Sequence, residues 1–210
     1  MNKYSIVSYY TIGTSYEKVY HKYLRNSEQK YSNEGIDFKI FTTVDNGDWF
    51  KNTAEKPNII LRFFEQNPDR DCVFLDIDAT IEKVPELFDN IPDCFDIAYH
   101  VLSWNDWYGY NSFPDKRELL TGTMYLRNND KVKRLCKEWY EKATTSHIWE
   151  QKVLQDIILH SDVMVYPLPL EYCYMVSRPG NREPLVKLEP VILHHQVSRK
   201  LKRNLNGEID

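Results

Sequence analysis

Residues 72–80 read CVFLDIDAT, and this segment indicates both the fold class and a candidate site. Its four leading apolar residues are typical of a strand that is buried on both faces of a parallel sheet. Asp76 and Asp78 follow directly. Side chains two positions apart on an extended chain point to the same side, so the two carboxylates can converge on one ion. Oxygen ligands of this kind suit Mg²⁺ or Mn²⁺. The alternative is a solvated turn in which both aspartates are merely exposed.

Segments typical of strands and of helices alternate before this one. Residues 4–10 and 36–43 are rich in β-branched and aromatic residues, which strands prefer. Between them, residues 15–30 predict a helix with Ser15 as its N-cap. Pro57 predicts the first turn of the next helix. The alternation predicts an α/β fold, a Rossmann-like and mostly parallel central sheet with helices on both faces.

The second half of the chain continues the pattern. Residues 103–115 combine Trp and Tyr side chains with glycine and proline, which predicts a loop. Amphipathic patterns predict helices at 131–142 and 149–160, and apolar runs predict short strands at 124–126 and 191–193. Open α/β sheets bind ligands beyond the carboxyl ends of their strands, which is where the two aspartates fall.

Length and composition limit the class of protein. The chain has 210 residues, 42% of them hydrophobic, which suits one domain, predicted at 1–206 and followed by a frayed tail at 207–210. A net charge of -4 disfavours a protein that holds a polyanion by electrostatics alone. The sequence shows no signal-peptide core, no long apolar span and no C-x-x-C pair among its cysteines. We expect a cytoplasmic protein of a bacterial or an infected host cell; the sequence indicates no oligomeric state.

The string around the aspartates resembles the first motif of the haloacid-dehalogenase-like phosphatases. In that family an apolar run is followed by D-x-D-x-T, which Asp76, Asp78 and Thr80 fit. The resemblance implies an Mg²⁺-dependent phosphatase with Asp76 as a covalent nucleophile. However, that family has the motif near the start of its sheet and a second acidic pair downstream, whereas here two strand-like segments precede the motif. The phosphatase is therefore the alternative hypothesis.

The chain resembles the GT-A glycosyltransferases over most of its length, especially small bacterial and phage nucleotide-diphospho-sugar transferases. Four further segments, in the family's order, carry this resemblance. They are ELLTGTMYLR at 118–127, WEQKVL at 149–154, LPLEYCY at 168–174 and PVILHHQ at 190–196. The resemblance implies a GT-A fold and transfer of a sugar from a nucleotide-diphospho-sugar, with UDP-sugars as the favoured donor class, to a hydroxyl acceptor.

The resemblance also implies a metal site with three ligands. Asp76 and Asp78 would hold Mn²⁺ or Mg²⁺ on the diphosphate, and a late strand would supply an imidazole. His194 and His195 both follow an apolar strand, and neighbours on a strand point in opposite directions. The position in the family string favours His194, whose neutral ring can ligate at pH 7. The alternative is a strand-end histidine bonded to the backbone.

Further residues are candidates for binding the donor. They are Thr11, Tyr16, Asp45, Arg62, Gly122, Thr123, Arg199 and Lys200. In this fold the loops after the first two strands receive the nucleoside, the segment around Gly122 lies beside the sugar, and Arg199 and Lys200 could neutralise the diphosphate. Structural roles are equally open, because Tyr16 could belong to the core, Asp45 to a turn and Arg62 to the surface.

The helix that starts near residue 149 supplies the candidate catalytic residues Gln151, Glu150 and Asp156. The resemblance places Gln151 at the reacting sugar, and Glu150 stands where the family has aspartate. A retaining reaction would fit Gln151, whereas an inverting reaction needs a carboxylate base, for which Glu150, Asp156 and Asp106 are candidates.

Three questions of function stay open at this point. The acceptor could be a glycan, a lipid-linked glycan or, given the Trp-rich segment 103–115 and the basic run 199–203, a modified DNA base. The stereochemical outcome could be retention or inversion. A non-catalytic module that binds a nucleotide-sugar is the third class of function.

Overall fold

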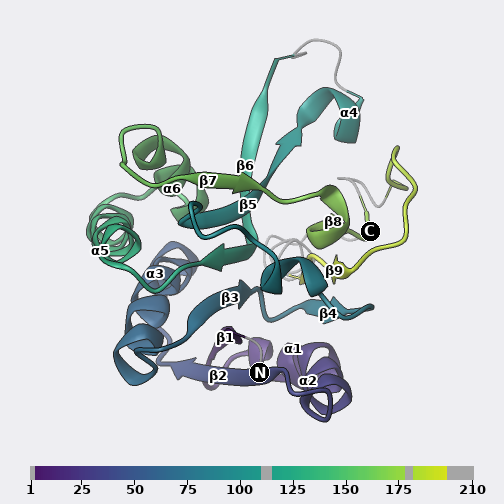
Figure 1. Ribbon diagram of the computed structural model, residues 1–210, viewed down its shortest axis with the longest axis horizontal. Coiled ribbons are helices and arrows are strands. Elements are labelled where there is room, and N and C mark those ends of the chain that lie inside the picture. The colour runs from purple at the N-terminus through teal and green to yellow at the C-terminus, as the bar shows by residue number, and fades with distance from the viewer. Residues whose placement is uncertain (1–2, 110–114, 178–181, 198–210) are drawn as a thin grey trace.

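The computed structural model describes residues 3–109, 115–177 and 182–197, so the expected tail at 207–210 and the candidates Arg199 and Lys200 lie outside the described residues. A six-stranded sheet with the strand order β2-β1-β3-β6-β5-β7 forms the centre (Figure 1). Its strands are β1 (Tyr4–Thr11), β2 (Asp37–Thr43), β3 (Asp71–Leu75), β5 (Ile97–Ser103), β6 (Arg117–Leu126) and β7 (Val165–Pro167).

The sheet is mostly parallel, as the sequence predicts. β1 pairs in parallel with β2 and β3, and β5 pairs in parallel with β7. β6 is antiparallel to both of its neighbours, β3 and β5. Within this described sheet, β6 alone therefore runs against the other strands.

Helices cover both faces of the sheet, which confirms the predicted fold class. α3 (Trp49–Gln66), α5 (Asp130–Thr145) and α6 (Glu150–Ile158) pack on one face, and α1 (Ser15–Lys22) and α2 (Leu24–Ser32) lie on the other (Figure 1). Strand side chains alternate between the two cores: Phe74 and Met124 belong to the first, Val73 and Tyr125 to the second. β3 is thus buried on both faces, which explains its unbroken apolar run.

A small second sheet, in the order β4-β9-β8, brings a late part of the chain back to the aspartates. β4 begins one residue after Asp78, and it pairs with β9 so that Ala79 lies opposite His194. The remaining elements are β4 (Ala79–Ile81), β8 (Tyr174–Met175), β9 (Ile192–His194), α4 (Trp104–Tyr108) and two 3₁₀ helices (Glu86–Asp89 and Leu170–Tyr172).

The first predicted helix is divided in two. The chain leaves helical geometry at Tyr23, which separates α1 from α2. The N-cap is Thr14 and not Ser15, because the Thr14 side chain accepts a hydrogen bond from the Tyr16 backbone N–H at 3.3 Å. The prediction of one uninterrupted helix over 15–30 was therefore wrong.

The next helix starts well before Pro57. Asp48 caps α3 by accepting a hydrogen bond from the Lys51 N–H at 3.1 Å, and Pro57 lies inside the helix. Proline has no N–H to offer the carbonyl of Thr53, four residues back. The Tyr9 hydroxyl supplies a donor there, 3.3 Å from that oxygen and 2.8 Å from the Asn52 carbonyl. This tertiary bond explains why a proline is accommodated where the sequence indicated a helix start.

The predicted loop at 103–115 contains a helix in its described part. α4 starts at Trp104, where the Ser103 side chain caps the Asp106 N–H at 3.4 Å. It ends at Gly109, which takes the left-handed conformation with φ of 69°. The loop prediction therefore missed a short capped helix.

β6 carries an irregularity at the centre of the sheet. Along β5 the register passes from Tyr99↔Met124 directly to His100↔Leu120. The three intervening residues of β6, Thr121, Gly122 and Thr123, thus have no partner position on β5. We call these three residues the β6 bulge. Bulges of this kind re-aim side and main chains near active sites.

Candidate active site

Asp76, Asp78 and His194 form a compact group at the end of β3. One ligand atom from each residue lies within 4.8 Å of the others. His195 points elsewhere: its Nε2 lies 3.0 Å from the Thr80 hydroxyl, and its ring stacks on Tyr23 with centroids 4.3 Å apart. The structure therefore places His194, and not His195, beside the two aspartates.

The β6 bulge builds the wall behind this group. Asp76 donates its backbone N–H to the Gly122 carbonyl at 2.8 Å, and the Thr123 hydroxyl lies 2.8 Å from Nε2 of His194. A β-carbon on Gly122 would come 2.9 Å from Cε1 of His194 and 3.2 Å from Oδ2 of Asp76. Only glycine leaves both ligands room. Because Thr123 engages Nε2, the Nδ1 of His194 is the nitrogen left for an ion, with the hydroxyl as its outer partner.

The electrostatics of the group favour a cation. Burial and the neighbouring Asp76 raise the pKa of Asp78 to about 6. Burial, with smaller contributions from Lys56 and His195, lowers the pKa of His194 to about 4, although Asp76 opposes that shift. The imidazole is therefore neutral at pH 7 and able to ligate, and two adjacent carboxylates require a counter-charge. These three residues fit a divalent ion with oxygen and nitrogen ligands.

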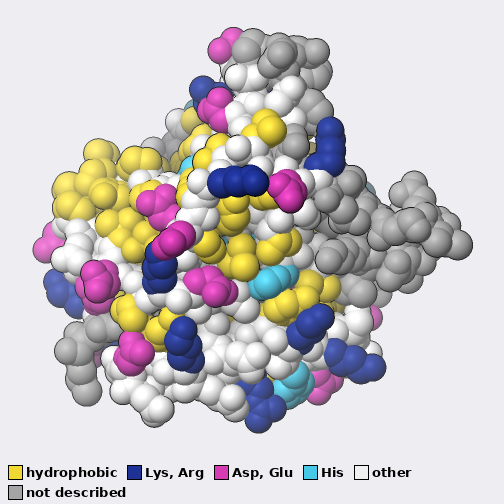
Figure 2. All heavy atoms as spheres, turned by 90° about the vertical axis from the view of Figure 1, so that its right-hand side faces the viewer, with side chains coloured by type: hydrophobic (Ala, Val, Ile, Leu, Met, Phe, Trp, Pro, Cys, Tyr) yellow, Lys and Arg dark blue, Asp and Glu magenta, His cyan; other side chains and the backbone are white. Residues whose placement is uncertain are grey.

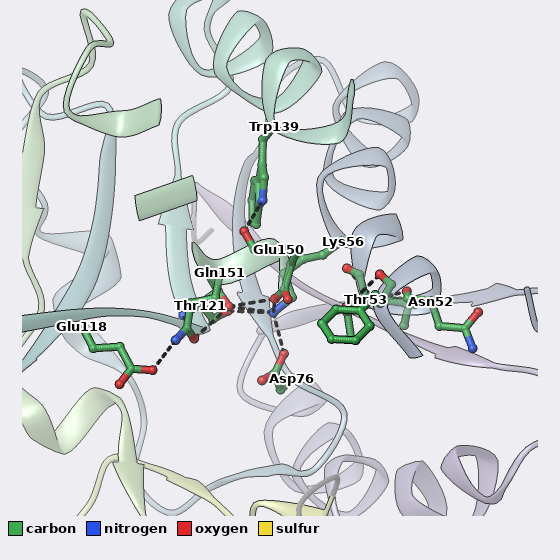
Figure 3. A network of polar contacts seen from close by, with 11 residues as sticks. Asn52, Thr53, Lys56, Asp76, Glu118, Thr121, Trp139, Glu150 and Gln151 are labelled. Carbon is green, nitrogen blue, oxygen red and sulfur yellow. Dashed lines mark hydrogen bonds and ion pairs between the residues drawn. The ribbon is translucent and has the colours of Figure 1, made fainter. Parts of the chain in front are cut away.

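Lys56 is a buried cation that the sequence analysis missed. Its side chain is 5% exposed, and Nζ lies 3.0 Å from Oδ1 of Asp76 and 3.0 Å from Oε1 of Glu150 (Figure 3). Burial alone would lower the pKa of Lys56, but these two carboxylates raise it above its ordinary value. The sequence holds a signal for this residue: Lys56 lies one helical turn before Ile60, on the buried stripe of α3.

Glu150 and Gln151 begin α6 and are both buried. Oε1 of Glu150 accepts a hydrogen bond from the Thr121 hydroxyl at 3.1 Å, while its Oε2 has no hydrogen-bond partner among the described residues. Oε1 of Gln151 accepts from the Thr121 N–H at 3.3 Å, and its Nε2 donates to Glu118 at 2.8 Å (Figure 3). The bulge residue Thr121 thus ties α6 to the sheet.

Two cavities open beside Asp76 and Asp78. The first cavity has an empty volume of about 800 Å³, open solvent at its mouth included. Its aromatic walls include Tyr10, Tyr16 and Trp49, and Thr11 and Lys56 are among its polar residues. The second cavity, of about 540 Å³, is lined on its far side by Glu118, Leu120, Cys173, Met175 and Gln196. Asp76, Asp78, Trp149 and Gln151 line both cavities. A molecule in each cavity would therefore meet the other at this shared wall.

Four candidates among the described residues line neither cavity: Asp45, Arg62, Thr123 and Asp156. Thr123 instead contacts His194, as described above. Asp45 accepts hydrogen bonds from Asn52 at 2.8 Å and from the Gly47 N–H at 2.9 Å, so it orients Asn52, which does line the first cavity. Arg62 lies over the Phe41 ring, 5.3 Å from its centroid.

Asp156 pairs with Lys152 at 2.9 Å on the exposed side of α6. Of the carboxylates considered as a base, Glu150 lines the first cavity, whereas Asp156 and Asp106 line neither. A local ion pair within the helix therefore accounts for the orientation of the Asp156 side chain.

One face of the molecule carries charges of both signs. Figure 2 shows acidic and basic side chains interspersed over the described part of the face that it presents. Among the helices of the described residues, none combines the length and the apolarity that a membrane crossing needs.

The sequence as a whole settles the family. Residues 14–205 match the sequence model of the nucleotide-diphospho-sugar transferases. The chain belongs to this family. It is therefore a glycosyltransferase, and the resemblance stated from the four short segments is confirmed. A comparison with curated protein sequences gives no match.

Solved structures share the fold of this transferase at low sequence identity. A glycosyltransferase involved in glycosylation of the major capsid of PBCV-1 has a TM-score of 0.66 at 13% identity, and the match covers 97% of this chain and 98% of that one. An active-site glutamine-to-glutamate mutant of LgtC has a TM-score of 0.55 at 13% identity, with 91% and 87% covered. The bifunctional glycosyltransferase WbbM has a TM-score of 0.56 at 11% identity, and the match covers 93% of this chain and 46% of that one.

Proposed function

We propose that this transferase moves a sugar from a UDP-sugar, held with Mn²⁺ or Mg²⁺ at Asp76, Asp78 and His194, to a hydroxyl of a neutral sugar acceptor. The observation that carries the proposal is the group of two carboxylates and one neutral imidazole at the wall shared by two cavities. A divalent ion at these ligands would supply positive charge against the diphosphate leaving group.

The first cavity suits the donor. Its aromatic walls at Tyr10 and Tyr16 offer surfaces for a nucleobase, and Thr11 offers a hydroxyl to the ribose. Trp49 and Trp149, whose ring centroids lie 6.0 Å apart, flank the cavity and would exclude water from the reacting bond.

Lys56 and α6 suit the sugar and phosphate end of that donor. Lys56 holds a positive charge beside Asp76 that needs no reorganisation when negative charge develops on the leaving group. Glu150 lines the first cavity, and its buried Oε2 has no hydrogen-bond partner among the described residues, so a sugar hydroxyl that reached it would satisfy this acceptor. Gln151 lies in the wall where donor and acceptor meet. Arg199 and Lys200, which follow His194 closely in the sequence, remain candidates for neutralising the diphosphate.

The second cavity suits a neutral acceptor. Three carboxylates line it, from Asp76, Asp78 and Glu118, and none of its described lining residues is Lys or Arg. The proposed ion would offset Asp76 and Asp78, but a phosphate-bearing acceptor such as DNA would still meet the carboxylate of Glu118 with no Lys or Arg beside it among the described lining residues. Leu120 and Met175 add apolar surface that fits the C–H face of a sugar ring. We therefore favour a glycan hydroxyl over a modified DNA base. The phosphatase and the non-catalytic module are set aside, because the family carries out sugar transfer.

Titration calorimetry tests the donor site. UDP, GDP and CMP are titrated into the protein with and without Mn²⁺, and we expect UDP to bind best and only with the ion. Asp78→Asn should weaken Mn²⁺-dependent UDP binding about 100-fold or more, because loss of even an outer partner of a metal ligand costs about 10- to 100-fold. The matched control Asp156→Asn should leave it unchanged. Equal UDP affinity in Asp78→Asn and wild type would refute the metal site.

Transfer assays test the acceptor. Labelled UDP-glucose and UDP-galactose are offered with a panel of methyl glycosides and, separately, with an oligonucleotide that contains hydroxymethylated bases. We expect label on a glycoside. Label on the oligonucleotide alone would overturn the choice of acceptor and leave the donor site intact.

A further inference from the structure

Glu118 lines the second cavity beside Gln151, and in the sequence it is only the first residue of the segment 118–127. It sits on β6 opposite Leu102 of β5. One of its carboxylate oxygens accepts the hydrogen bond from Nε2 of Gln151 at 2.8 Å. The other accepts from the indole N–H of Trp104 at 2.7 Å. The carboxylate therefore links the first residue of α4 to a residue of the candidate active site.

This contact removes the ambiguity of the Gln151 side chain. An amide has a donor end and an acceptor end of the same shape, so either could face a given neighbour. The Thr121 backbone N–H can only donate, and it lies 3.3 Å from Oε1 of Gln151. The Glu118 carboxylate can only accept, and it holds Nε2. The two neighbours therefore select one orientation, with the amide nitrogen toward Glu118 (Figure 3).

Glu118 is itself held in place from outside the site. Its partner Trp104 is packed under Lys116, whose Nζ lies 3.2 Å from the centroid of the Trp104 ring. Trp104 also packs edge-on against Tyr108, with centroids 5.2 Å apart. A large anchored ring thus restricts the Glu118 rotamer, and hence the amide of Gln151.

We propose that Glu118 is a positioning residue, which fixes the carboxamide of Gln151 at the wall between the two cavities while Trp104 fixes Glu118. The proposal rests on the proposed function only in assigning Gln151 to the reacting site. Glu118 acts through Gln151 and needs no covalent or proton-transfer step of its own. The sequence alone does not reveal this role, because the two partners of Glu118 are 33 and 14 positions away in the chain.

NMR spectroscopy of the ligand-free protein tests the contact directly. The indole resonance of Trp104, one of five tryptophans, is assigned by its loss in Trp104→Phe, and the side-chain amide of Gln151 by its loss in Gln151→Leu. In Glu118→Gln, we expect both resonances to shift, because a carboxamide cannot accept from both donors with equal strength. Glu65→Gln, the same change on the exposed side of α3, should move neither. An unmoved Gln151 amide in folded Glu118→Gln would overturn the proposal.

Kinetics then separate positioning from a general structural role. With UDP-glucose or UDP-galactose and Mn²⁺, Glu118→Gln should lower kcat about tenfold or more and change KM for the donor less than twofold. Trp104→Phe, which keeps a ring and loses the N–H, should give a smaller loss. A loss of kcat that accompanies a loss of thermal stability, and that disappears when the assay is cooled, would indicate a structural role. That result would overturn the proposal. Failure of wild type to bind UDP with Mn²⁺ would instead refute the proposed function, and the amide resonance would still report on Glu118.

Discussion

Gly122 and His194 approach each other so closely that a β-carbon on Gly122 would lie 2.9 Å from Cε1 and 3.1 Å from Nδ1 of the imidazole. Real β-carbons essentially never come within 3.0 Å of such a neighbour, so Gly122→Ala must displace the ring or the backbone of residue 122. Metal ligands tolerate only about 0.2 Å of displacement. We expect Gly122→Ala to lower Mn²⁺ affinity about tenfold, measured by calorimetry.

A second glycine supplies the control. Gly35 has φ of 82°, and a β-carbon added there would meet nothing within 4 Å, so Gly35→Ala strains the backbone without touching the site. It should lower the free energy of unfolding by about 1 kcal/mol and leave Mn²⁺ affinity unchanged. Similar Mn²⁺ affinities in the two variants would argue against the role assigned to Gly122.

The buried Lys56 gives a prediction about stability. Lys56→Met leaves Glu150, which is 2% exposed, without its counter-ion. Breaking a buried pair in this way should cost about 3 kcal/mol of unfolding free energy, measured by urea denaturation. The partner Asp76 is 41% exposed and adds little to that loss.

A compensating change separates charge from packing. Adding Glu150→Gln to Lys56→Met removes the uncompensated charge and should recover at least half of the lost stability, but not the binding of a UDP-sugar. If the double variant lost as much unfolding free energy as the two single variants lose together, the two charges would not interact as described.

Metal binding should depend on pH through Asp78. Its pKa is raised to about 6, so below that pH a bound ion must displace a proton, whereas above it the carboxylate is already ionised. His194, with a pKa lowered to about 4, stays neutral throughout this range. We expect Mn²⁺ affinity to fall about tenfold per pH unit below pH 6 and to level off above it. Calorimetry from pH 5 to pH 8 would show this; a flat profile in wild type would contradict it.

The contact between Tyr9 and the carbonyl of Thr53 can be tested by a double-mutant cycle. Tyr9→Phe removes the donor from a helix that contains Pro57, and should cost about 1–2 kcal/mol of unfolding free energy. In Pro57→Ala the backbone N–H is restored and can serve the same carbonyl, so Tyr9→Phe should cost less there. Additive effects in urea denaturation would show that the hydroxyl does not compensate for the proline.

The fold was predictable because its signals are local. The apolar run before Asp76 predicts a strand buried on two faces. The alternation of strand-like and helix-like segments along the chain predicts helices on both faces of the sheet. The same run placed two carboxylates at the strand end. His194 needed one further fact, that β9 pairs with β4, and this pairing joins residues far apart in the chain.

The rest of the candidate site depends on orientation and on long-range packing. Asp45 follows a strand, as a ligand-binding residue does, but hydrogen bonds to Asn52 and Gly47 fix its side chain elsewhere. Lys56 became a site residue only because α3 begins earlier than Pro57 suggested and turns its buried stripe toward Glu150. Glu118 is one of several polar residues along β6 until the fold brings Trp104 and Gln151 to it.

The length of the β6 bulge decides which way the outer half of this strand faces. Side chains of a strand alternate between its two sides, so deleting one residue from Thr121–Thr123 would reverse every side chain from Arg117 to Leu120. Glu118 would then face away from Gln151. The three residues at the base of this half-strand are therefore fixed in number by the side chains that they orient.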